Sequence, residues 1–148
     1  MHLKEKIASL GAAILLCSNF SVVTYADTAT VTSIENDGIS PAYEITNSCS
    51  SNLEIVGGIV ECKSIAKGTD AISITVTQTL QKYWGLWIWE DVNGATWTET
   101  TDFNFVCLYN TKSNLKNGTY RVKSVFTLTN DNGRQETITI YSSEKKIV

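Results

Sequence analysis

The segment Ile72-Ser-Ile-Thr-Val-Thr-Gln-Thr-Leu80 carries the clearest structural signal in this chain. Aliphatic side chains alternate in it with serine, threonine and glutamine. An alternation of period two is typical of a β-strand with one face in the core and the other face in water. The positions expected to face the core are Ile72, Ile74, Val76 and Leu80.

Turn signals divide the rest of the chain into short segments of the same kind. Three glycine-containing dipeptides lie between runs of β-branched and aromatic residues; they are Gly57-Gly58, Asn93-Gly94 and Asn132-Gly133. Such dipeptides favour tight hairpins because they accept positive φ angles. About seven or eight short strands with regularly spaced turns and no helical period predict an all-β sandwich over residues 41–148.

The last hairpin offers a choice of register. A two-residue turn at Asn132-Gly133 would pair Phe126 with Thr139, whereas a three-residue loop with a bulge at Gly133 would pair Phe126 with Ile138. A slip of one residue moves every side chain of a strand to the other face of the sheet. The burial of apolar side chains therefore favours the three-residue loop.

The first 26 residues have the three parts of a secretory signal peptide. Lys4 and Lys6 supply a positive start, residues 7–16 are almost entirely apolar, and small residues precede a cleavage point after Ala26. The apolar run is shorter than the roughly 20 residues that a membrane-spanning helix needs. We therefore expect a signal-peptide helix over residues 1–26 and a secreted, extracellular mature protein without a membrane span. A buried N-terminal helix is the alternative.

Cleavage after Ala26 would change the chemistry of the chain. It would remove the only histidine, the only methionine and Cys17, and it would leave a mildly acidic protein that begins with a flexible polar leader over residues 27–40. Acidity argues against a nucleic-acid partner, because phosphate backbones are bound by basic patches. Without histidine, the usual catalytic triads and His-ligated metal sites are excluded. No metal is expected for that reason. No cofactor is expected either, because no nucleotide-binding motif is present.

The segment Leu115-Lys-Asn-Gly-Thr-Tyr120 resembles the tyrosine corner of immunoglobulin-like and fibronectin type III domains. In that motif the tyrosine hydroxyl bonds back to the backbone and the leucine packs at the end of a sheet. The resemblance implies a Greek-key sandwich with a buried core tryptophan, here Trp87. It also implies that the strands around Cys62 and Cys107 are neighbours, and it favours these two of the three mature cysteines as partners, with Cys49 left over.

Several short motifs are similar to a family of small secreted proteins of unknown function from Gram-positive bacteria. The motifs are Gly58-Ile-Val-Glu-Cys62, Thr79-Leu80-Gln81-Lys82 followed by Trp87, Gly118-Thr-Tyr-Arg121-Val-Lys123, and Glu136-Thr137 with Ser142-Ser143. The resemblance covers most of the mature chain. It implies a secreted immunoglobulin-like sandwich, and it carries no established activity.

A cluster of tryptophans is the strongest functional signal, and the family pattern does not predict it. The cluster consists of Trp84, Trp87, Trp89 and Trp97. If Asn93-Gly94 forms a hairpin turn, Trp97 faces one side of the sheet while Trp87 and Trp89 face the other. Only one side can be core in a two-layer sandwich, so one set is expected to be exposed or covered by a loop. Trp84 and Trp97 are the candidates for exposure.

Exposed aromatic rings beside carboxylates suit stacking on a sugar or contact with a protein. The sequence therefore favours a non-enzymatic binding module that recognises carbohydrate or protein outside the cell through Trp84 and Trp97, with Glu90 and Glu99 beside them. One alternative is a released effector, such as an inhibitor or an antagonistic toxin. Another is a glycoside hydrolase, whose carboxylate pair would come from Glu90, Asp91, Glu99 and Asp102. Solvated strand and turn positions are the ordinary interpretation of such carboxylates.

Overall fold

The computed structural model describes residues 43–148, and this part of the chain contains eight β-strands and no helix. The strands are β1 (Thr46–Val56), β2 (Ile59–Gly68), β3 (Ala71–Gly85), β4 (Ile88–Thr101), β5 (Phe105–Lys112), β6 (Gly118–Asn130), β7 (Gln135–Tyr141) and β8 (Lys145–Ile147). The expected signal peptide and the expected leader lie outside the described residues.

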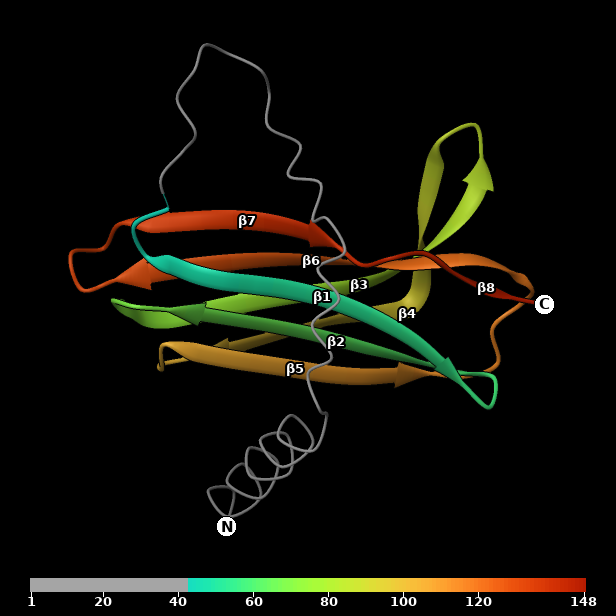
Figure 1. The fold of residues 1–148 in the computed structure, drawn as a ribbon, viewed down its shortest axis with the longest axis horizontal. Helices are drawn as coiled ribbons and strands as arrows, with labels where there is room; N and C mark the ends of the chain where they lie inside the picture. Colours follow the sequence, from blue (N-terminus) through green and yellow to red (C-terminus); the bar gives the residue numbers. More distant parts are fainter. Residues whose placement is uncertain (1–42) are drawn as a thin grey trace.

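The strands form two antiparallel sheets, which Figure 1 shows one in front of the other. One sheet has the order β1-β2-β5, and the other has the order β4-β3-β6-β7 with β8 also paired to β6. Apolar side chains from both sheets fill the space between them in two clusters, one toward each end of the molecule. The all-β prediction is therefore confirmed.

Strand β3 has the expected alternation, with one local difference. Ile74, Val76 and Leu80 are completely buried, as expected. Ile72 is exposed, because the register between β3 and β6 shifts between Ala71 and Ser73. The bulge at this shift turns Ile72 outward, and Ala71 takes the buried position at the end of the strand.

The first and last hairpins follow the sequence signals. Val56 pairs with Ile59 across the Gly57-Gly58 turn. In the last hairpin Phe126 pairs with Ile138, which is the register that the three-residue loop predicts. Burial of Ile138 selects this register, since a slip of one residue would expose it.

The predicted turn at Asn93-Gly94 is wrong. Strand β4 passes through these residues without reversing, and residues 92–95 bulge out opposite Leu80 of β3. Gly94 has a φ of 65°, and its carbonyl accepts a hydrogen bond of 3.1 Å from Lys112 Nζ. A dipeptide that accepts positive φ suits a bulge as well as a hairpin turn, so the local signal did not distinguish them.

A layer of hydrogen-bonded polar side chains separates the two apolar clusters. Gln78 Nε2 donates to Ser64 Oγ at 2.7 Å, and Ser64 and Ser124 share a hydrogen bond of 2.7 Å. Ser124 Oγ then donates to Ser51 Oγ at 2.8 Å, while Asn110 Nδ2 donates to Gln78 Oε1 at 3.0 Å. We call these five residues the polar relay; they come from β1, β2, β3, β5 and β6 and so tie both sheets together.

The tyrosine-corner geometry is present at the start of β6. The Tyr120 hydroxyl donates to the Lys116 carbonyl at 2.6 Å, while the ring is buried and Leu115 packs against the same apolar cluster. This is the backward hydrogen bond that the resemblance implies.

The carboxylate of Glu136 ties β7 to the segment that leads into β1. It accepts hydrogen bonds from the backbone amides of Glu44 at 2.8 Å, Ile45 at 3.1 Å and Thr46 at 3.1 Å, and from the Thr46 hydroxyl at 2.9 Å. Burial alone would raise the pKa of Glu136, but these hydrogen bonds outweigh it and lower the pKa below its ordinary value of 4.5.

The polar relay should be sensitive to the loss of one member. We expect Gln78→Leu to lower the free energy of unfolding by about 1–3 kcal/mol, because it removes the partner of Asn110 Nδ2 and one of the two hydrogen bonds of Ser64. Equilibrium unfolding in urea measures this. Thr77→Val, on the neighbouring outward position, is the matched control and should change stability much less, because it keeps a β-branched side chain and gives up only an exposed hydrogen bond to Thr98. Equal stability of Gln78→Leu and the native protein would contradict the role of the relay.

The Glu136 contact predicts a pH dependence. Because the folded-state pKa is lowered, the stabilisation is complete above the ordinary value of 4.5 and is lost as the pH falls through the folded-state pKa. Glu136→Gln should therefore be less stable than the native protein at pH 7, by about 1–3 kcal/mol. Thermal unfolding at several pH values should show this difference shrinking in acid; a difference that is constant with pH would refute the assignment.

Candidate functional site

The end of β3 and the start of β4 form a hairpin that stands away from both sheets, as Figure 1 shows. Residues 83–89 of this hairpin carry no charged side chain and include Trp84, Trp87 and Trp89. The bulge at residues 92–95 breaks the regular pairing of β4 just before the hairpin leaves the sheet. Such bulges bend a strand, which accounts for the change of direction.

The hairpin turns at Leu86-Trp87, between the paired residues Gly85 and Ile88. Leu86 has a φ of 51° and Trp87 a φ of 66°. Two-residue hairpins of this kind need positive φ at both central positions and normally use Asn-Gly. A bulky residue in this conformation costs roughly 1–2 kcal/mol. Leucine and tryptophan are therefore poor choices for the stability of this turn.

No packing within the described residues offsets that cost. Trp87 is 90% exposed and Leu86 is 88% exposed. The prediction that Trp87 is the buried core tryptophan is thus wrong, because the residue lies at the apex of a turn rather than within a strand. Trp84, an unpaired bulge residue, is 69% exposed, and Ile88 is 53% exposed. We call these four side chains the hairpin tip.

The base of the hairpin is braced by aromatic and cationic contacts. The guanidinium of Arg121 lies 4.1 Å from the ring centroids of both Trp89 and Tyr141, and its Nε donates to Gln81 Oε1 at 3.0 Å. Trp89 also contacts Tyr83, with their ring centroids 5.1 Å apart. Stacked guanidinium and aromatic groups of this kind are stabilising. The tip is therefore presented on an ordered base.

The structure separates the two tryptophans that the sequence proposed as one site. Trp97 lies on the edge strand β4, where it pairs with Gln78 of β3. It is half-buried and packs against both apolar clusters. Trp84 lies at the far end of the hairpin. A shared site of Trp84 and Trp97 is thus wrong, because it depended on a turn at Asn93-Gly94 that the chain does not make.

The proposed carboxylates are separated in the same way. Glu90 is exposed opposite Lys82, whereas Glu99 is half-buried opposite Val76, and burial raises the pKa of the Glu99 carboxyl. Their partners lie six positions apart on β3, which corresponds to about 20 Å along a strand. Paired carboxylates of glycoside hydrolases lie only about 5–10 Å apart. Glu90 and Glu99 therefore do not form such a pair.

The strands around Cys62 and Cys107 are neighbours, but the two side chains point to opposite faces of the sheet. Cys62 lies opposite Asn110 on the inner face, and Cys107 lies opposite Ile65 on the outer face. Cys62 is a buried free thiol, so the favoured partnership between Cys62 and Cys107 is wrong as a disulfide. The resemblance correctly made the two strands neighbours. Side chains alternate between the two faces of a strand, so the register of β2 and β5 puts Cys62 and Cys107 on opposite faces.

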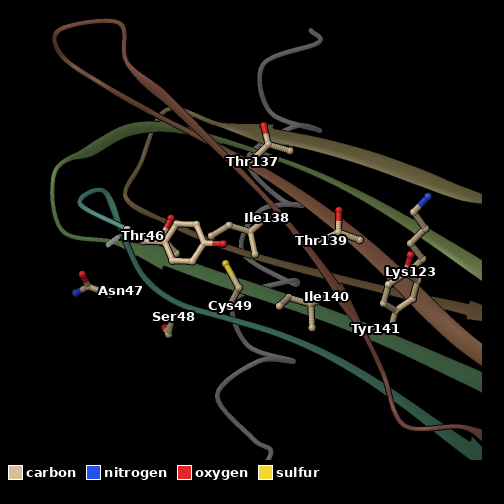
Figure 2. A pocket seen from close by; sticks show the side chains of 11 residues that line it. Thr46, Asn47, Ser48, Cys49, Lys123, Thr137, Ile138, Thr139, Ile140 and Tyr141 are labelled. Carbon is tan, nitrogen blue, oxygen red and sulfur yellow. The ribbon is translucent and has the colours of Figure 1, made fainter. Parts of the chain in front are cut away.

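A groove runs between β1 and β7 at the other side of the sandwich, and Figure 2 shows the residues that line it. Cys49 reaches into it from β1, opposite Ile138 and Ile140 of β7. Burial raises the pKa of the Cys49 thiol to about 12, so the reactive thiolate is scarce. Lys123 is the only charged residue in the lining, so the groove holds neither an activated thiolate nor a charge pair that would indicate a reaction.

Within residues 43–148, no group of histidine, cysteine, aspartate or glutamate side chains is placed to hold a metal ion. In the same part of the chain, no helix is long and apolar enough to cross a membrane. A scan against protein-family models and a search of curated proteins both find no match. The resemblance to a Gram-positive secreted family therefore stays an expectation.

Leu86 and Ile88 were not predicted from the sequence as members of the tip. The signal that would have found them is the uncharged run of residues 83–89 between Lys82 and Glu90, in which aromatic and aliphatic side chains occupy consecutive positions. A continuous apolar run is also typical of a strand buried on both faces, so the run marks the segment as unusual without showing that it is exposed.

The turn predicts a gain of stability on substitution. The double change Leu86→Asn with Trp87→Gly introduces the residues that this turn prefers, so we expect the free energy of unfolding to rise by about 1–3 kcal/mol. Urea unfolding and the Tm measure the change. Trp84→Ser, which removes an exposed side chain outside the turn, should give no comparable gain. A double variant that is less stable than the native protein would show that the tip has a structural role.

Proposed function

We propose that this protein is a secreted, non-enzymatic binding module that attaches to a surface outside the cell through the hairpin tip. The observation that carries the proposal is the exposure of Trp84, Leu86, Trp87 and Ile88 together on one protruding turn. Contiguous exposed apolar side chains mark interaction sites in soluble proteins. The backbone strain at Leu86 and Trp87 also supports the proposal, because strained backbone conformations cluster at functional sites.

The proposal includes a Greek-key sandwich of the immunoglobulin-like or fibronectin type III kind. The chain passes from one sheet to the other between β2 and β3, between β4 and β5, and between β5 and β6. This order and the backward hydrogen bond of Tyr120 support that assignment. Domains of this kind place binding loops at the ends of the sandwich, which is where the hairpin tip lies.

The proposal also includes export. A signal peptide cleaved after Ala26 would release the domain into the medium, where the tip is free to meet a partner. The sequence pointed to a carbohydrate or protein surface read by Trp84 and Trp97. The burial of Trp97 moves the proposed contact to the hairpin tip, with the exposed Glu90 at its edge.

Attachment can be tested on intact cells with the labelled protein purified from culture medium. We expect Leu86→Asn with Trp87→Gly to reduce binding at least about tenfold, because two large apolar contacts are lost. The matched control is Phe103→Ser, which removes an exposed aromatic residue from the β4–β5 loop at the opposite end of β4. Its binding should equal that of the native protein. Equal binding by the double variant would overturn the proposal.

A further inference from the structure

We infer that the hairpin tip inserts into the interfacial layer of an electrically neutral phospholipid bilayer. This inference rests on the proposed function and names the surface to which the tip attaches. It follows from the composition of the tip, the state of its backbone, and its length and charge.

The composition of the tip suits acyl chains better than sugars. Residues 84–88 contain two tryptophans, a leucine and an isoleucine, and the fifth residue is Gly85. Recognition of a sugar needs hydrogen-bonding side chains around the aromatic ring, and none of these five residues supplies one apart from the two indole N–H groups. Tryptophan is enriched where a protein meets the membrane–water interface, because its ring is apolar and its N–H can stay hydrated.

The tip is convex, and one backbone pair closes its turn. It projects from the body of the protein, so a rigid partner would need a matching pocket, whereas a fluid bilayer needs none. Gly85 pairs with Ile88 directly across the two-residue turn. This matters because an unpaired backbone group is costly in lipid. The turn exposes its apolar side chains around this closing pair, and the Trp87 amide donates a hydrogen bond of 3.4 Å to the Tyr83 hydroxyl.

The length of the hairpin tip sets how deeply it can insert, and the charge at its base sets the kind of lipid that it favours. The uncharged arms end at Lys82 and Glu90, which lie opposite each other and cancel in charge. Five residues lie beyond the Tyr83–Trp89 pair, as the bulge residue Trp84, one further pair and a two-residue turn. They project by about 7 Å, which is within the roughly 5–10 Å reached by interfacial segments. A neutral boundary on a mildly acidic chain favours lipids without net charge over anionic lipids.

The test uses the secreted protein and phosphatidylcholine vesicles in a sedimentation assay, with tryptophan fluorescence as the second measurement. We expect co-sedimentation that changes little between low and high salt, because apolar insertion is not screened. Tryptophan emission should shift to the blue and be quenched by lipids brominated on the acyl chain. Leu86→Asn with Trp87→Gly should weaken partitioning at least about tenfold, since two apolar side chains are removed. The substituted turn suits Asn-Gly, so a folded variant is expected.

The controls separate this inference from the proposed function. Phe103→Ser should partition like the native protein, because that residue lies away from the tip. Absence of vesicle binding by the native protein would overturn the lipid assignment. If the double variant then still lost binding to intact cells, the tip would contact a protein or a glycan and the proposed function would stand. Vesicle binding that survives the double substitution would also overturn the inference.

Discussion

The polar relay around Gln78 determines how the two sheets lie on each other. Apolar contacts above and below it are non-directional, so they tolerate small slides of one sheet over the other. The hydrogen bonds from Gln78 to Ser64 and onward to Ser124 are directional, and every buried side-chain polar atom in the described residues has a partner. A slide of two residues would leave these groups unpaired among apolar side chains, which is costly. Uniqueness of the packing therefore comes from a small polar minority in the core.

Strands β3 and β4 pack into the core at one end and form the exposed hairpin at the other. Near the relay, β3 and β4 contribute Gln78 and Trp97 to the interior. Beyond the bulge at residues 92–95, β3 stays paired with β6 as far as Lys82, and past that residue β3 and β4 pair only with each other. The bulge allows the change of role because it breaks the regular pairing and bends the strand. Arg121 then holds the base through contacts with Trp89 and neighbouring groups. The sandwich thus acts as a rigid support for a protruding apolar turn.

Local patterns predicted the fold well where burial discriminates between alternatives. The last hairpin is an example, because only one register buries Ile138 against the core. The hairpin tip could not be derived in the same way. Asn93-Gly94 satisfies a turn and a bulge equally, and the choice depends on the long-range pairing of β4 with β3. The real turn uses Leu86-Trp87, which local propensity disfavours, so the exposed position of Trp87 was missed while that of Trp84 was anticipated.

The inward orientation of Cys62 in β2 affects how readily the protein is oxidised. Because Cys62 faces inward, burial raises the pKa of its thiol to about 12 and no oxidant reaches it while the fold is closed. The thiol of Cys49 is only half-buried in its groove, but burial raises its pKa to about 12 as well, so little thiolate forms. A buried thiol such as that of Cys62 can stay unmodified in an oxidising medium, where an exposed cysteine would couple to other molecules. Its redox lifetime is then set by the rate at which the sandwich opens.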